Sequence, residues 1–136
     1  MKKLFLIAIL TLICMPLYAH EHRTVGKYEF VAGFLTEPAF SGQMNGADIR
    51  VSEGGQPVEG LEERLKITVL YGEKSLELPL RARYKQPGAY GAYFLPSQPG
   101  KYTFLVKGKI GETEIDEKFE SGSGFHDLED SAAVTL

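Results

Sequence analysis

The sequence predicts an all-β protein, an immunoglobulin-like antiparallel β-sandwich of about seven strands. Apolar and polar residues alternate in short runs along most of the chain, which is the period of strands with one buried and one solvated face. No long segment has the period of an amphipathic helix. Glycine and proline turn signals separate the runs at regular spacing, as in a sandwich of short strands.

The first two strands are expected at 27–34 and 48–52. In the earlier run, apolar residues occupy every second position and the charged Lys27 and Glu29 occupy positions between them. In the later run, Ile49 and Val51 alternate with polar residues. This two-residue period places the apolar side chains of each run on one face, where a second sheet would cover them.

Five further strands are expected at 66–71, 75–80, 89–95, 101–107 and 114–120. Four of these runs alternate, whereas 89–95 is apolar on both faces and is therefore expected to lie inside a sheet. The residues expected to contribute to the core are Phe30, Val51, Ile67, Val69, Leu78, Tyr102, Phe104 and Val106.

The connections carry their own signals. A Pro-Gly-x-Tyr turn at 87–90 recurs at 99–102, so each copy is expected to start a strand, and Tyr102 is a candidate tyrosine corner. The stretch 35–46 is a long connection without strand character, and a Ser/Gly-rich link at 121–124 leads to an acidic tail segment. Loops of this length often carry function.

The segment Met1–Ala19 is predicted to be a cleavable signal peptide. Lys2 and Lys3 precede an apolar run at Leu4–Ile13, and the small Ala19 suits a cleavage site. The run is too short to span a bilayer comfortably, and no second such run follows it. We therefore expect a periplasmic or secreted protein with no membrane span after cleavage, consisting of a single domain at 20–136.

Composition narrows the possible functions of that domain. Cleavage would remove two lysines and no acid, leaving 13 Lys and Arg against 18 Asp and Glu, a formal net charge of −5. An acidic chain repels nucleic acid, so nucleic-acid binding is not expected. The only cysteine, Cys14, lies in the signal segment, where it also offers a lipoprotein alternative. The mature domain thus has no disulfide and no catalytic thiol.

The mature N-terminus is the strongest candidate for a metal site. Cleavage after Ala19 would expose His20-Glu21-His22, with a free α-amine beside two imidazoles. In one geometry the amine, two deprotonated backbone amides and the His22 imidazole surround the metal in a square plane. In the other, the amine and imidazole of His20 chelate it together and a distant imidazole completes the set. The first geometry suits Cu(II) or Ni(II), and the second suits Cu(II), which prefers tetragonal nitrogen coordination.

A late histidine could supply the distant ligand. His126 lies beside Asp127 in the tail segment, and in a sandwich the N-terminal and late segments can meet at one end. His126 would then bind the metal, and Asp127 or Asp130 would act as an axial ligand or orient another ligand. The alternative interpretation is a solvated N-terminus and a solvated acidic tail with no metal.

No motif for catalysis was found. The sequence contains no nucleophile elbow, phosphate-binding loop or zinc-protease helix, so no catalytic residues are assigned and an enzyme is not expected. Two functions therefore compete. One is a non-catalytic exported metal-binding protein with copper as its ligand. The other is a metal-free secreted module that binds a protein or glycan partner through a sheet face or the 35–46 loop.

The segment at 87–108, PGAYGAYFLPSQPGKYTFLVKG, together with the export signal and the first mature residue His20, resembles small bacterial exported immunoglobulin-like domains. These include the YtkA-like proteins and the copper-carrier family known as CopC. The resemblance implies a copper carrier or sensor without catalysis, with a copper-handling protein as a partner. In the copper carriers the first mature His binds Cu(II) with a late Asp-x-His pair. Here the corresponding pair is His126-Asp127, in reversed order and without a spacer.

Overall fold

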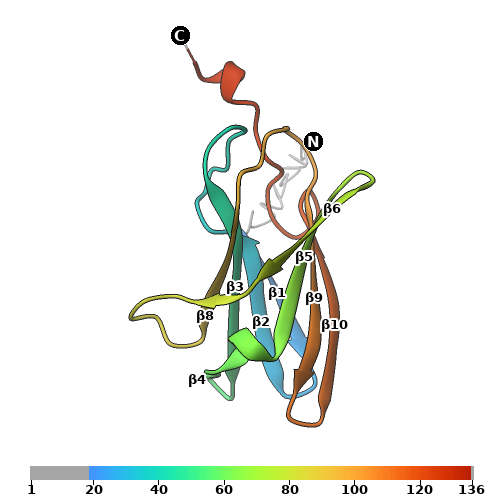
Figure 1. The fold of residues 1–136 in the computed structure, drawn as a ribbon. Helices are drawn as coiled ribbons and strands as arrows, with labels where there is room; N and C mark the ends of the chain where they lie inside the picture. The colour runs from blue at the N-terminus through green and yellow to red at the C-terminus, as the bar shows by residue number, and fades with distance from the viewer. Residues whose placement is uncertain (1–18, 136) are drawn as a thin grey trace, which may run out of the picture.

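The computed structural model describes residues 19–135 and contains two antiparallel β-sheets packed face to face (Figure 1). The first sheet comprises β1 (His20–Val25), β2 (Tyr28–Phe34), β3 (Asn45–Glu53), β4 (Gln56–Pro57), β7 (Arg81–Ala82) and β8 (Ala89–Phe94). The second comprises β5 (Leu65–Tyr71), β6 (Lys74–Pro79), β9 (Thr103–Ile110) and β10 (Thr113–Glu120). Two short 3₁₀ turns, η1 (Leu61–Glu63) and η2 (Ser131–Ala133), are the only helical elements in this part of the chain.

The strand order is β1-β2-β3-β8-β7 in the first sheet, with β4 paired to β3, and β10-β9-β5-β6 in the second. All strand pairs are antiparallel, which confirms the predicted all-β sandwich. Within the described residues, no helix is long and apolar enough to cross a membrane. The signal-peptide prediction falls on residues 1–18, which lie outside the described part, and on Ala19.

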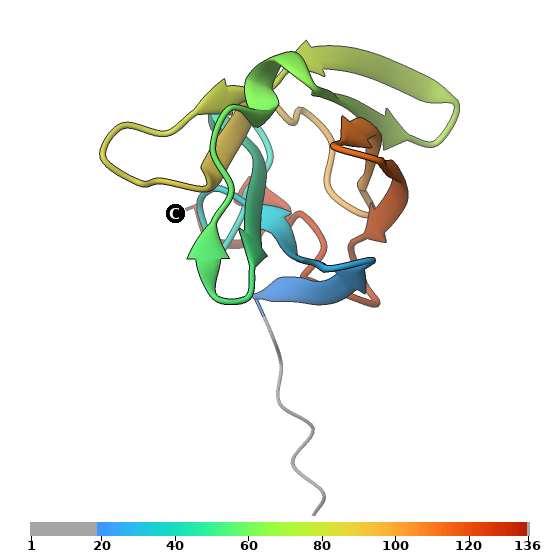
Figure 2. The same cartoon turned by 90° about the horizontal axis from the view of Figure 1, so that it is seen from below.

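The core lies between the two sheets. Figure 2 shows the arrangement of the sheets around it, seen from below. Seven of the eight residues expected in the core are buried, and Leu78 packs against them while partly exposed. At one end of the sandwich, Phe34 makes edge-to-face contacts with Tyr102, Phe104 and Phe125. The Tyr102 hydroxyl donates to the Gln98 carbonyl oxygen at 2.8 Å, four residues upstream, as expected of a tyrosine corner.

The seven expected strands correspond to β2, β3, β5, β6, β8, β9 and β10. The structure adds two strands of two residues each and, more importantly, β1. Residues 20–25 form an edge strand paired along their full length with β2. A strand rather than a solvated end therefore carries His20 and His22, which places both imidazoles on a defined surface.

Arg23 ties this edge strand to the second sheet. Its guanidinium donates to Glu21 at 2.6 Å, to Glu117 at 2.9 Å and to the Lys118 carbonyl oxygen at 2.9 Å. It also lies 4.4 Å from the centre of the Phe119 ring. Because Glu117, Lys118 and Phe119 all belong to β10, the contacts join β1 to β10 across the side of the sandwich.

The start of β1, the β2–β3 loop and the tail that follows β10 lie at the same end of the sandwich (Figure 1). Backbone hydrogen bonds connect the loop to the tail: Glu129 N–H donates to Ala39 O at 2.8 Å, and Ser41 N–H donates to Glu129 O at 2.9 Å. The tail also pairs with Gly100 through Leu128, in both directions. Two segments far apart in sequence are thereby fixed next to the start of β1.

Candidate functional site

His20 begins β1 and lies in a row of residues that crosses the outer face of the first sheet. The strand registers align His20 with Gly33, Gly33 with Asp48, Asp48 with Gly91, and Gly91 with Arg81. His20 Nε2 reaches across β2 and lies 3.1 Å from Asp48 Oδ2. The imidazole is therefore held by a carboxylate two strands away.

Asp48 is almost fully buried although it points away from the core. Only 2 % of it is accessible, because cationic and aromatic side chains cover it. Besides His20, Arg50 Nε lies 3.3 Å from Oδ2 and Arg83 Nη1 lies 3.4 Å from Oδ1. A buried carboxylate is stable only when paired and hydrogen-bonded, and Asp48 meets this requirement from three sides.

The two glycines beside Asp48 make this arrangement possible. A Cβ atom at Gly33 would lie 2.8 Å from His20 Cδ2, so any larger residue would displace the imidazole from Asp48. On the other side, a Cβ atom at Gly91 would lie 3.1 Å from the phenol of Tyr93. Glycine inside a strand often marks such a close approach of another group.

The hydrogen bond to Asp48 determines which His20 nitrogen is available. Asp48 engages Nε2, and none of the described residues hydrogen-bonds to Nδ1. Metal-binding histidines commonly present one ring nitrogen to the metal while a carboxylate holds the other. Nδ1 is also the nitrogen that can close a chelate ring with the α-amine of the same residue.

Glu37, in the β2–β3 loop, lies close to both His20 and His126. Burial raises its carboxyl pKa, while a hydrogen bond from the Phe34 backbone and the charges of His20 and His126 act in the opposite direction. Its Oε1 atom is buried without a hydrogen-bond partner. Among the described residues, only one other buried side-chain oxygen or nitrogen lacks a partner, namely Oε2 of Glu21.

Glu21 belongs to β1, the strand that also carries His20 and His22. A pocket of about 480 Å³ is lined by His20, Glu21 and His22 of β1 and by Ser123 and Gly124 of the tail. Glu21 packs so closely on the tail that a Cβ atom at Gly124 would overlap its carboxylate. The tail thus closes over the strand that carries both histidines.

The four ligands that the sequence predicts lie in three separate places in the structure. His20 and His126 both lie near Glu37, and His22 lines the pocket of the β1 edge. Asp127 instead accepts a hydrogen bond from the buried Ser121 hydroxyl, which itself accepts from the Tyr102 N–H and so fixes the turn of the tail. Between residues 19 and 135, no three His, Cys, Asp or Glu side chains are gathered closely enough to hold a metal ion.

Sequence reasoning missed Asp48 and Glu37. Asp48 lies on the polar face of its strand, as the alternation of residues 48–52 predicts, but the alternation contains no sign that this face is covered. The available signal was glycine at positions 33 and 91, inside runs that otherwise read as strands. Glu37 lies in a loop and has no periodic signal.

Comparisons of the chain with protein families, with characterised proteins and with solved structures found no match.

Proposed function

We propose that this chain is an exported, non-catalytic copper-binding protein, a Cu(II) carrier or sensor of the periplasm or cell exterior. The observation that supports it best is the His20–Asp48 contact of 3.1 Å. Asp48 holds Nε2, so cleavage after Ala19 would leave Nδ1 and the new α-amine of the same residue free to chelate a metal. The likeness to YtkA-like and CopC-like domains noted from the sequence agrees with this role.

The β1–β2 pairing favours one of the two chelate geometries. A square-planar set would need the consecutive backbone nitrogens of Glu21 and His22. In a strand, consecutive N–H groups point to opposite sides, so one of these two faces β2 in the ladder that pairs Glu21 with Ala32 and His22 with Val31. That geometry would break the ladder, whereas chelation by the amine and Nδ1 of His20 leaves it intact.

We assign the remaining positions of the site to Glu37 and His126, which lie near His20 and would have to draw closer together to bind one metal ion. His126 would supply a second imidazole, and Oε1 of Glu37 would supply a carboxylate oxygen that is already buried without a hydrogen-bond partner. Two imidazoles, an amine and a carboxylate form a donor set suited to Cu(II). Copper bound there would be the cargo of a carrier or the signal of a sensor. The bound ion would link the β2–β3 loop, the tail and β1.

The test is a Cu(II) titration of protein that begins at His20, in competition with a chelator of known affinity. We expect one Cu(II) per chain. His126→Ala should weaken binding strongly, while His22→Ala, the matched loss of an imidazole on the same strand as His20, should have a small effect. Removal of all bound metal by a weak competitor would refute the proposal, and the reverse ranking of the two variants would favour the square-planar clamp.

Glu37→Gln should lower the copper affinity without lowering the free energy of unfolding. The folded pKa of Glu37 lies above its unfolded value, so the ionised carboxylate opposes folding above that pKa, and stability should increase as pH falls through it. Near neutral pH the neutral amide should leave the free energy of unfolding unchanged or raise it by less than about 1 kcal/mol, because the site is partly solvated. Copper affinity should fall about 10- to 100-fold.

Urea denaturation and the chelator titration measure the two effects on the same samples. If Glu37→Gln lowers the free energy of unfolding by as much as it weakens the free energy of copper binding, Glu37 has only a structural role.

The copper affinity of the unsubstituted mature protein should decrease toward pH 5, because the amine and the imidazoles must be deprotonated to bind the metal.

A further inference from the structure

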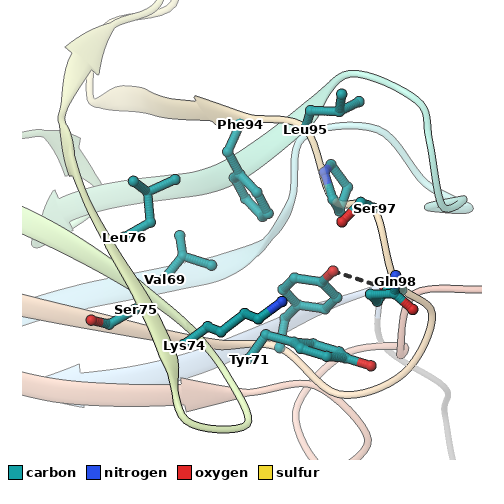
Figure 3. Close-up of a pocket in the computed structure, with 11 residues that line it drawn as sticks. Val69, Tyr71, Lys74, Ser75, Leu76, Phe94, Leu95, Ser97 and Gln98 are labelled. Atoms are coloured by element: carbon teal, nitrogen blue, oxygen red, sulfur yellow. Dashed lines mark hydrogen bonds between the residues drawn. The ribbon is translucent and has the colours of Figure 1, made fainter.

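A second candidate site lies on the other side of the molecule, between β6 and the loop that joins β8 to β9. Its walls are aromatic, formed by Tyr71, Phe94 and Tyr102, and the half-exposed Leu76 and Leu95 stand at its rim (Figure 3). The Tyr71 and Tyr102 rings lie 4.8 Å apart between centres. Their hydroxyls donate to the carbonyl oxygens of Pro99 and Gln98 at 2.8 Å, so loop hydrogen bonds hold both rings in place.

The size of this pocket indicates the kind of ligand it can take. Its volume is about 250 Å³. Pockets that enclose a whole small ligand usually have volumes of about 300–1,000 Å³. The pocket is therefore better suited to a single large side chain that belongs to a longer partner.

The strand beside the pocket has an open edge. Among the described strands, β6 pairs only with β5, and nearly all its residues are exposed. Tyr71 pairs with Lys74 across a two-residue turn, and every second residue of β6 from Lys74 onward forms backbone hydrogen bonds with β5. These residues are Lys74, Leu76 and Leu78. Ser75 and Glu77 therefore direct their backbone N–H and C=O groups outward, where an added strand would pair with them.

Lys74 gives the edge a charge preference. It lines the pocket together with Leu76, two positions further along the same face of β6 (Figure 3). No hydrogen bond or ion pair within the described part of the chain uses its ammonium group, and no acidic residue lines the pocket. An acidic group on a partner would find an unpaired cation there.

From these observations we infer that β6 and its pocket bind an extended peptide as an additional strand. The peptide carries a large apolar residue followed two positions later by Asp or Glu. Antiparallel pairing, the arrangement of every other strand in this sheet, places the apolar residue opposite Leu76 and in the pocket, and the acid opposite Lys74. The backbone of Ser75 and Glu77 supplies the ladder, as in other cases of strand addition.

The test uses two end-blocked, fluorescently labelled peptides of the same composition. In the first, Thr-Thr-Leu-Thr-Glu-Thr, leucine and glutamate share a face. In the second, Thr-Thr-Leu-Glu-Thr-Thr, they point to opposite faces. Fluorescence anisotropy should show saturable binding of the first and markedly weaker binding of the second. Lys74→Glu should weaken binding of the first peptide about tenfold, since an attraction becomes a repulsion, and should favour a lysine-containing analogue.

Three further variants complete the test. Lys109→Glu makes the same charge change on an exposed residue outside the pocket and should leave binding unchanged. Leu76→Asp and Glu77→Pro should each abolish binding, and circular dichroism should show that both variants keep their strands. Equal affinity for the two peptides, or no saturation at millimolar concentration, would overturn the inference. Dimerisation that Glu77→Pro removes would instead assign the edge to a second copy.

Discussion

Adding one alanine before His20 is expected to lower the Cu(II) affinity of the mature protein by at least about 100-fold, because even changes outside the ligand shell cost 10- to 100-fold. The extension turns the His20 amine into an amide, so the chelate with Nδ1 cannot form. It also moves His22 to the fourth position, which removes the square-planar alternative. The contact of His20 with Asp48 is unaffected, so stability should not change.

A two-residue extension provides the matched control. With Ala-Ala before it, His20 becomes the third residue, and an amine, two amides and the His20 imidazole can form a square plane ahead of β1. We expect this variant to bind Cu(II) again, with a changed visible absorption spectrum and without dependence on His126. Equal affinity of the native and one-residue-extended proteins in the chelator competition would exclude the proposed N-terminal chelate.

Replacing Asp48 is expected to have the largest effect on stability. Arg83 and His20 each have only 22 % of the side chain exposed. Asp48→Ala would leave both without their buried partner and would remove the acceptor from Arg50. Breaking a buried pair by removing one partner costs about 3–5 kcal/mol, and we expect the lower end of this range because the cations can partly reach water. Urea denaturation of the two proteins measures the difference.

Glu53→Ala is the control on the same strand. Glu53 is exposed and pairs with the exposed Lys27 at 3.1 Å, so its removal should cost less than about 1 kcal/mol. Asp48→Asn keeps the shape and one acceptor, and should lie between the two. Similar small losses for Asp48→Ala and Glu53→Ala would show that the Asp48 cluster does not stabilise the fold.

The sequence by itself determined the sandwich and seven of its strands. The two-residue period of Phe30, Ile67, Val69 and Phe104 reports directly which side of each strand is buried, because the period is a local property of an extended chain. Turn residues then separate the strands. The edge strand β1 escaped prediction because its residues, His-Glu-His-Arg-Thr-Val, are polar at nearly every position. Its pairing with β2 and the contacts of Arg23 with β10 replace the missing apolar pattern.

The sequence identified only some of the residues of the candidate metal site. His20, His22 and His126 were recognised from their residue type and from the predicted cleavage, which needs no fold. Tertiary structure alone decided the place of Asp48, because its burial depends on His20 and Arg83, which lie 28 and 35 residues away along the chain.

Glu37 owes its desolvated oxygen to the packing of the β2–β3 loop at the end of the sandwich that also holds the start of β1 and the tail. Sequence periodicity describes one strand at a time. A group on an outer face or in a loop acquires its chemistry from neighbours that only the folded chain brings to it.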